Sequence, residues 1–225
     1  NVNLAPVLDG ALAWDGSEGW MGHRERAFGT TDAVILPAAR AFARGCRQAG
    51  VVSIGKHFPG YDVPGNTDEE LQVSGADLAQ LTASERRFHA AGDVVVGYMM
   101  SSVVYAALTR RPAVLEDRLV ARARVGPDHV IMTDDLWSLA LRRWLRPELA
   151  VTWSDYPADA WAELGAEALR AGNDLLLVTY PQKAMDLRDA LVDLARREAW
   201  ARAAVDRAVR RILLLKAELG LLPPG

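Results

Sequence analysis

The sequence predicts an α/β domain built on a parallel sheet. Short, continuous apolar runs alternate with helical stretches, which is typical of strands buried on both faces. The Gly- and Pro-rich parts follow the apolar runs, where loops are expected, and no low-complexity segment or linker interrupts the chain. The 225 residues, of which 50% are hydrophobic, are enough for one core. We therefore expect one domain over residues 1–225.

The strands are predicted from apolar runs that end at a glycine or a polar residue. Five runs are well defined: 2–8, 51–55, 94–99, 129–133 and 174–178. A sixth, at 149–153, has a weaker pattern.

The helices are predicted from apolar spacing and from their end signals. They cover 37–48, 82–91, 114–123, 158–171, 183–196 and 201–219. Gly50, Gly92 and Gly172 follow three of these stretches, at the position that helix C-caps prefer. Thr82 and Glu85 have the spacing of a capping box. The last helix has one apolar face, which predicts a core-facing stripe of Val205, Val209, Ile212, Leu213 and Leu219.

Composition excludes several kinds of partner. A net charge of −3 leaves no basic stripe, so no nucleic acid is expected, and the apolar runs are too short for a membrane span. The lone Cys46 excludes an internal disulfide and a cysteine-based zinc site. Neither ligand spacing nor a Gly-rich phosphate loop occurs, so we expect no metal and no cofactor. The chain opens at Asn1 without a leader, and the compartment, cytoplasmic or secreted, stays open.

Polar side chains follow four of the predicted strands. They are Asp9, Lys56 with His57, Ser101 with Ser102, and Asp134 with Asp135. The carboxyl ends of parallel strands meet at one edge, which carries the active site in barrels and the ligand in doubly wound sheets. The pattern predicts a site there without choosing between the two folds.

Four motifs give the chain a family resemblance. NLAPVLD at 3–9, RAFG at 26–29, KHFPG at 56–60 and VIMTDDL at 130–136 occur in this order. The ordered set resembles glycoside hydrolase family 3, in its β-N-acetylglucosaminidase branch. AGNDLLLV at 171–178 and the terminal RRILLLKAELGL are similar to the family as well.

This resemblance implies a (β/α)₈ TIM-barrel fold of which about five to six strands are present. The missing strands would precede residue 1, so residues 1–225 would form a partial barrel domain of a longer protein. The strand at 2–8 should then be an edge strand, and apolar residues that face the missing part should be exposed.

The resemblance also implies the chemistry. Asp134 matches the nucleophile of a retaining β-N-acetylglucosaminidase, which forms a covalent glycosyl-enzyme intermediate. Arg26, Lys56 and His57 match residues that bind the hydroxyls of the sugar. Asp135 is expected to support the nucleophile, and Asp9 is expected to be structural. The substrate would be a glycan or muropeptide with terminal β-linked N-acetylglucosamine.

One loop departs from the family pattern. The family has an acid/base histidine after KHFPG, whereas this chain continues YDVPGNTDEEL at 61–71. Asp68 falls on the family's aspartate and Glu70 on its histidine. His23, His89 and His129 occur in other contexts and are no obvious substitutes.

Two interpretations of this loop stay open. Glu70 could act as the acid if like-charge repulsion from Asp68 and Glu69 keeps it protonated, or the loop could be an ordinary solvated acidic segment. The alternative function is therefore a catalytically impaired homologue that binds sugar or a partner protein without efficient hydrolysis.

Overall fold

A computed structural model describes residues 1–149 and 156–222 of the chain. Its main sheet is parallel and has the order β1-β2-β4-β6. These strands are β1 Val2–Asn3, β2 Val52–Phe58, β4 Gly97–Met100 and β6 Val130–Met132. Chain order and spatial order agree, whereas a doubly wound sheet reverses its order at a switch point. The predicted α/β class is confirmed, and the order is that of a sector of a (β/α)₈ barrel.

The sheet is open, and β1 is one of its edges, as predicted. Among the described residues no strand pairs with the outer side of β1, and the strands close no ring. The predicted strand at 2–8 is discontinuous, because it pairs with β2 at Val2–Asn3 and again only through a bridge between Val7 and Lys56.

The predicted strand at 174–178 is wrong in form. It makes one parallel bridge, between Leu175 and Met132, and no ladder. Side-chain oxygens take the place of ladder carbonyls: Asp174 Oδ2 accepts from Ile131 N at 2.9 Å, and Thr133 Oγ1 accepts from Leu177 N at 2.9 Å. The segment still runs beside β6. The weaker prediction at 149–153 lies almost wholly outside the described residues.

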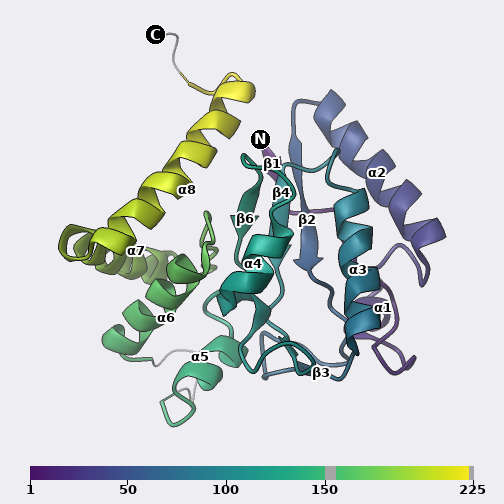
Figure 1. Cartoon of the computed structure of the whole chain (residues 1–225), viewed down its shortest axis with the longest axis horizontal. Coiled ribbons are helices and arrows are strands. Elements are labelled where there is room, and N and C mark those ends of the chain that lie inside the picture. Colours follow the sequence, from purple (N-terminus) through teal and green to yellow (C-terminus); the bar gives the residue numbers. More distant parts are fainter. Residues whose placement is uncertain (150–155, 223–225) are drawn as a thin grey trace.

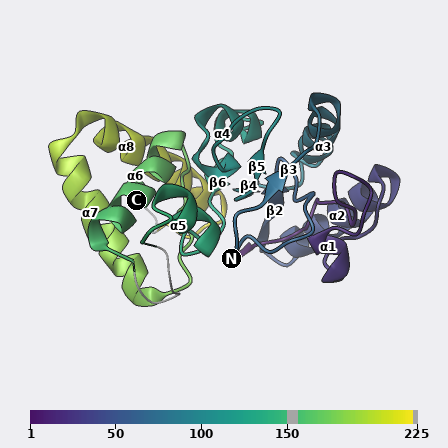
Figure 2. The same ribbon diagram turned by 90° about the horizontal axis from the view of Figure 1, so that it is seen from below.

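Helices cover the sheet on both flanks in Figures 1 and 2, with α2 and α3 on one side and α6, α7 and α8 on the other. The longer helices are α2 Asp32–Gln48, α3 Leu78–Ala90, α6 Ala158–Ala171, α7 Pro181–Arg197 and α8 Ala199–Glu218. The shorter ones are α1 Trp20–His23, the 3₁₀ turn η1 Ala113–Leu115, α4 Asp117–Ala123 and α5 Leu139–Leu145. None of the described helices is long and apolar enough to cross a membrane.

Two predicted helix starts are wrong. Helix α2 begins at Asp32, and Pro37 lies inside it rather than at its start. The capping box of α3 is formed by Asp77 and Gln80, whose side chains each accept the other's backbone N–H, at 2.8 and 2.9 Å. The proposed cap Thr82 instead donates its hydroxyl to a carbonyl within the helix, at 2.6 Å.

The predicted core-facing stripe of α8 is also wrong in part. The buried residues of α8 are the small ones, Ala201, Ala204 and Ala208, which allow close approach to neighbouring helices. Val209 and Leu213 are each 45% exposed. Helical periodicity identified an apolar face, but the alanine face is the one that packs.

The inner face of the sheet carries its own apolar layer. Ile54, Met99 and Met132, one from each of three neighbouring strands, are buried together there. Lys56 follows Ile54 at the spacing that keeps side chains on one face of a strand. Two short strands that were not predicted, β3 Val73–Ser74 and β5 Val104–Tyr105, form a small parallel sheet beside the main one.

Candidate active site

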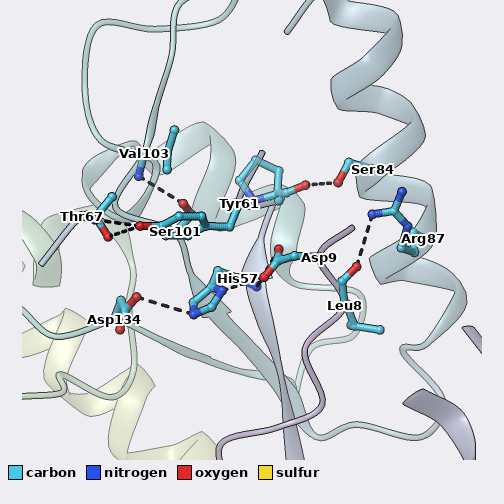
Figure 3. A network of polar contacts seen from close by, with 12 residues as sticks. Leu8, Asp9, His57, Tyr61, Thr67, Ser84, Arg87, Ser101, Val103 and Asp134 are labelled. Carbon is cyan, nitrogen blue, oxygen red and sulfur yellow. Dashed lines mark hydrogen bonds and ion pairs between the residues drawn. The ribbon is translucent and has the colours of Figure 1, made fainter. Parts of the chain in front are cut away.

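Asp134 lies directly after β6, at the carboxyl edge of the sheet. Its Oδ1 accepts the backbone N–H of Asp135 at 2.9 Å. Its Oδ2 lies 3.8 Å from Nε2 of His57, and 22% of the side chain is exposed (Figure 3). The carboxylate is thus fixed by its own turn and directed at the end of β2.

His57 is held from behind by Asp9, which is fully buried. Both carboxylate oxygens of Asp9 accept the backbone N–H of His57 at 3.1 Å, and Oδ2 lies 2.7 Å from Nδ1 of the ring. An ionised Asp9 can only accept, so the proton of this bond belongs to Nδ1. Nε2 therefore faces Asp134, and the expected structural role of Asp9 includes orienting this ring.

Lys56 is anchored between Pro6 and Leu8. Its N–H donates to Pro6 O at 3.0 Å, and its carbonyl accepts from Leu8 N at 2.7 Å. Burial, and then the charge of Arg26, lower the pKa of the Lys56 ammonium, while Asp134 and Asp9 act in the opposite direction. The side chain thus lies in the combined field of the site's charged groups.

Arg26 lies in the turn after α1 and interacts electrostatically with Lys56. Glu25 has a φ of 53°, and Arg26 N donates to Met21 O at 2.8 Å, which closes the turn. Arg26 itself is exposed, and its charge acts on both Lys56 and Asp68. Of the three predicted sugar-binding residues, His57 and Lys56 thus interact with Asp134 directly, and Arg26 acts on Lys56 and Asp68 beside it.

Asp135 connects the turn that carries Asp134 to the segment after residue 174. Its Oδ2 accepts the hydroxyl of Thr179 at 2.6 Å, and its Oδ1 accepts from Trp137 N at 3.1 Å and Thr179 N at 3.2 Å. These contacts agree with the supporting role expected for Asp135.

The loop that departs from the family pattern lies against this site. Asp68 O accepts from Leu139 N at 2.9 Å, which attaches the loop to the start of α5. Partial desolvation of the carboxyl, and then repulsion from Asp134 and Asp135, raise the pKa of Asp68, although the residue as a whole is exposed. Asp68 therefore shares the field of Asp134.

Glu70 lies differently from Asp68. It is exposed, and its Oε1 accepts from Gln72 Nε2 at 2.8 Å. The structure thus separates the two acidic residues of the predicted pair: Asp68 interacts electrostatically with Asp134, and Glu70 bonds within its own loop.

Sequence reasoning gave no role to Tyr61 or Thr67. The Tyr61 hydroxyl accepts from Thr67 N at 2.7 Å, and its ring centroid lies 5.3 Å from that of His57. The available signal was that Tyr61 and Asp62 replace a His-Gly pair that follows KHFPG in the family pattern, whose histidine is distinct from the acid/base one.

The remaining polar candidates have structural partners. Ser101 Oγ accepts from Val103 N at 3.1 Å, and Ser102 is buried. His89 and His129 contact backbone carbonyls away from this edge. Within residues 1–149 and 156–222, no group of three His, Cys, Asp or Glu side chains could hold a metal ion.

The chain matches known proteins along nearly all of its length. Residues 1–215 match the model of the glycosyl hydrolase family 3 N terminal domain. A β-hexosaminidase of Methylococcus capsulatus is 33% identical over 198 residues, which cover 85% of this chain and 54% of the relative. A β-hexosaminidase of Bordetella pertussis is 34% identical over 194 residues, covering 84% and 49%.

Solved structures agree with these matches. The β-N-acetylhexosaminidase from Beutenbergia cavernae superposes with a TM-score of 0.78 at 29% identity, over 96% of this chain and 63% of that one. The fold is thus of the TIM-barrel type, as predicted. The chain spans about half the length of the curated relatives it matches.

Proposed function

Since the chain belongs to glycosyl hydrolase family 3, we propose that the full-length protein is a retaining glycosidase that removes terminal β-linked N-acetylhexosamine. The relatives of 33% and 34% identity bear the name β-hexosaminidase, which supports this substrate class. The natural substrate would be an N-acetylglucosamine-containing glycan or muropeptide.

Asp134 is the nucleophile in this proposal. The observation that carries it is the position of its carboxylate, 3.8 Å from His57 Nε2 and within the field of Lys56. An oxygen of Asp134 bonds to the anomeric carbon while the bond from that carbon to the leaving oxygen breaks. Water then attacks the anomeric carbon, which releases the sugar and restores the carboxylate.

Arg26, Lys56 and His57 bind the sugar hydroxyls in this reaction. Charged donors make stronger hydrogen bonds than neutral ones, and the bonds gain strength as positive charge develops on the ring. The three residues come from two segments, Lys56 and His57 from β2 and Arg26 from the turn after α1, so together they fix the orientation of the ring above Asp134.

The proton for the leaving group comes from the acidic cluster at 68–70, and we favour Asp68 over Glu70. A raised pKa keeps a carboxyl protonated at higher pH, as a general acid requires, and Asp68 has this property because of desolvation and its neighbours Asp134 and Asp135. After glycosylation the same carboxylate removes a proton from the attacking water.

The test uses the full-length protein and its Asp134→Asn variant. Turnover of aryl β-N-acetylglucosaminides should fall to background while the circular dichroism spectrum and melting temperature stay near those of the wild type. A variant with near-normal kcat would refute the nucleophile assignment.

The acid is tested with two leaving groups. Asp68→Asn should spare 2,4-dinitrophenyl glycosides, which need little protonation, and slow alkyl glycosides by about 10²–10⁴-fold. Glu70→Gln is the matched control. If Glu70→Gln shows this selective loss instead, Glu70 is the acid, as its alignment with the family's histidine suggests.

The impaired homologue is the second candidate, because none of the chain's four histidines lies in the acid/base loop. A wild-type protein that binds N-acetylglucosamine but turns over neither class of glycoside would favour it.

A further inference from the structure

We propose that Tyr61 is a positioning residue that holds the loop at 61–70 closed over the sugar site and thereby keeps Asp68 beside Asp134. The inference rests on the proposed function. It also assigns a role to a residue at which this chain departs from the family pattern.

The Tyr61 hydroxyl fastens the loop at two points. It accepts the N–H of Thr67 at 2.7 Å, and its oxygen lies 3.1 Å from both Gly65 O and Thr67 Oγ1, to either of which it can donate its proton. Tyr61 is 3% exposed, so these bonds form away from solvent. A buried N–H that loses its partner is unfavourable because the lost bond is not replaced by water, so the hydroxyl favours this loop conformation over open ones.

The ring of Tyr61 connects the loop to the floor of the site. It is tilted by 58° against the His57 ring at a centroid distance of 5.3 Å. Figure 3 shows the hydroxyl directed at Thr67, with His57 and Asp134 below. His57 is itself fixed by Asp9, so one chain of contacts runs from the buried carboxylate to the residue before Asp68.

The position of Asp68 depends on the hydrogen bonds of Tyr61 because both neighbours of Asp68 along the chain belong to the same loop. Its backbone has two anchors besides the bond at Thr67: Asp68 N donates to Asn66 Oδ1 at 3.0 Å, and Asp68 O accepts from Leu139 N at 2.9 Å. The first anchor moves with the loop. If Tyr61 releases Thr67, the described bonds that still connect this part of the loop to α5 are those from Leu139 N to Asp68 O and from Arg143 to Glu69 O.

The Tyr61 hydroxyl can make these hydrogen bonds over a wide pH range. Burial raises the pKa of Tyr61 to about 12, so the phenol stays neutral and can both donate and accept.

The matched control is Tyr98, another buried tyrosine whose hydroxyl donates to a backbone carbonyl, Phe88 O, at 2.5 Å. Tyr98 lies on β4 and packs against Phe58 and Phe88, in the core between the sheet and α3. Tyr98→Phe removes a buried hydroxyl without touching the loop, so it reports the effect of lost stability alone.

The first experiment measures kcat/KM of full-length Tyr61→Phe on two glycosides. We expect a loss of about tenfold on an alkyl glycoside and less than about twofold on the 2,4-dinitrophenyl glycoside, because only the former needs the acid. Tyr98→Phe should change both equally or neither. In the Asp68→Asn background, Tyr61→Phe should cause no further loss. Equal losses on both substrates, or a full additional loss in that background, would overturn the proposal.

The second experiment does not depend on turnover, so it separates failure of this inference from failure of the proposed function. Hydrogen exchange should show lower protection at the amides of Thr67 and Leu139 in Tyr61→Phe, and NMR titration should show the Asp68 pKa nearer its ordinary value. Unchanged protection and an unchanged titration would show that Tyr61 is only a packing residue.

Discussion

Replacing Asp9 with asparagine is expected to lower activity by changing the orientation or the tautomer of His57, although Asp9 itself does not contact the substrate. Asp9 is fully buried and accepts three hydrogen bonds, all from His57, at 2.7 to 3.1 Å. Asparagine has one acceptor oxygen and one donor nitrogen in the same volume. If its oxygen keeps the bond to Nδ1, its amide opposes the backbone N–H of His57. If the amide turns, it donates to Nδ1 and moves the ring proton to Nε2, which faces Asp134.

Either outcome loses one hydrogen bond to a charged acceptor, which contributes about 1.5–3 kcal/mol. We therefore expect kcat/KM of Asp9→Asn on aryl glycosides to fall by about tenfold to hundredfold, since 1.4 kcal/mol corresponds to about a factor of ten. Nitrogen-15 NMR of the ring should show the proton on Nδ1 in the wild type and a changed state in the variant. Asp93→Asn is the control, because Asp93 is 60% exposed and pairs with Arg40 on the surface. An Asp9→Asn protein with wild-type kcat/KM and unchanged ring signals would refute the reasoning.

Three further predictions concern stability. Because the folded pKa of Asp68 is raised above 3.8, the folded state binds its proton more tightly than the unfolded state, and folding loses stability as pH rises through the folded pKa. The melting temperature of Asp68→Asn should thus be equal to or higher than that of the wild type at pH 7. Any increase in melting temperature should disappear below pH 3.8. A lower melting temperature of the variant at pH 7 would contradict the prediction. Gly97→Ala should prevent folding or destabilise severely, because the added Cβ would lie 1.8 Å from Val130 O in the neighbouring strand. Gly45→Ala, in open space on α2, should stabilise by about 0.5–1 kcal/mol; chemical denaturation that ranks the two variants in the opposite order would contradict both predictions.

The sequence was informative where a residue's role depends on its immediate neighbours. The apolar run before Asp134 and the one before Lys56 identified the strands and the edge that carries the site, and TDDL with KHFPG identified the family. Gly172, with a φ of 103°, ends its helix as its position predicts.

Contacts between distant segments were not predictable from the chain alone. Nothing local to Asp9 indicates that it bonds to a ring 48 positions away. Equally, the run at 174–178 has the composition of a strand and keeps backbone bonds to Ile131 and Thr133, but the Asp174 and Thr133 side chains take the place of two backbone acceptors. Helix α8 offers an alanine face and a leucine face, and periodicity cannot tell which one meets a neighbour.

The division between strand ends and loop has an evolutionary consequence. Lys56 lies in β2 and Asp134 follows β6, so the sheet fixes the backbone at both residues, whereas Asp68 belongs to a loop held by its own residues, Tyr61 and Thr67. Under the proposed mechanism, mutation of this one loop is therefore enough to replace the proton donor, while Asp134 and the sugar-binding residues stay the same. For the same reason, an experiment that introduces a loop with a histidine should replace the loop at 61–70 and leave the adjoining strands unchanged.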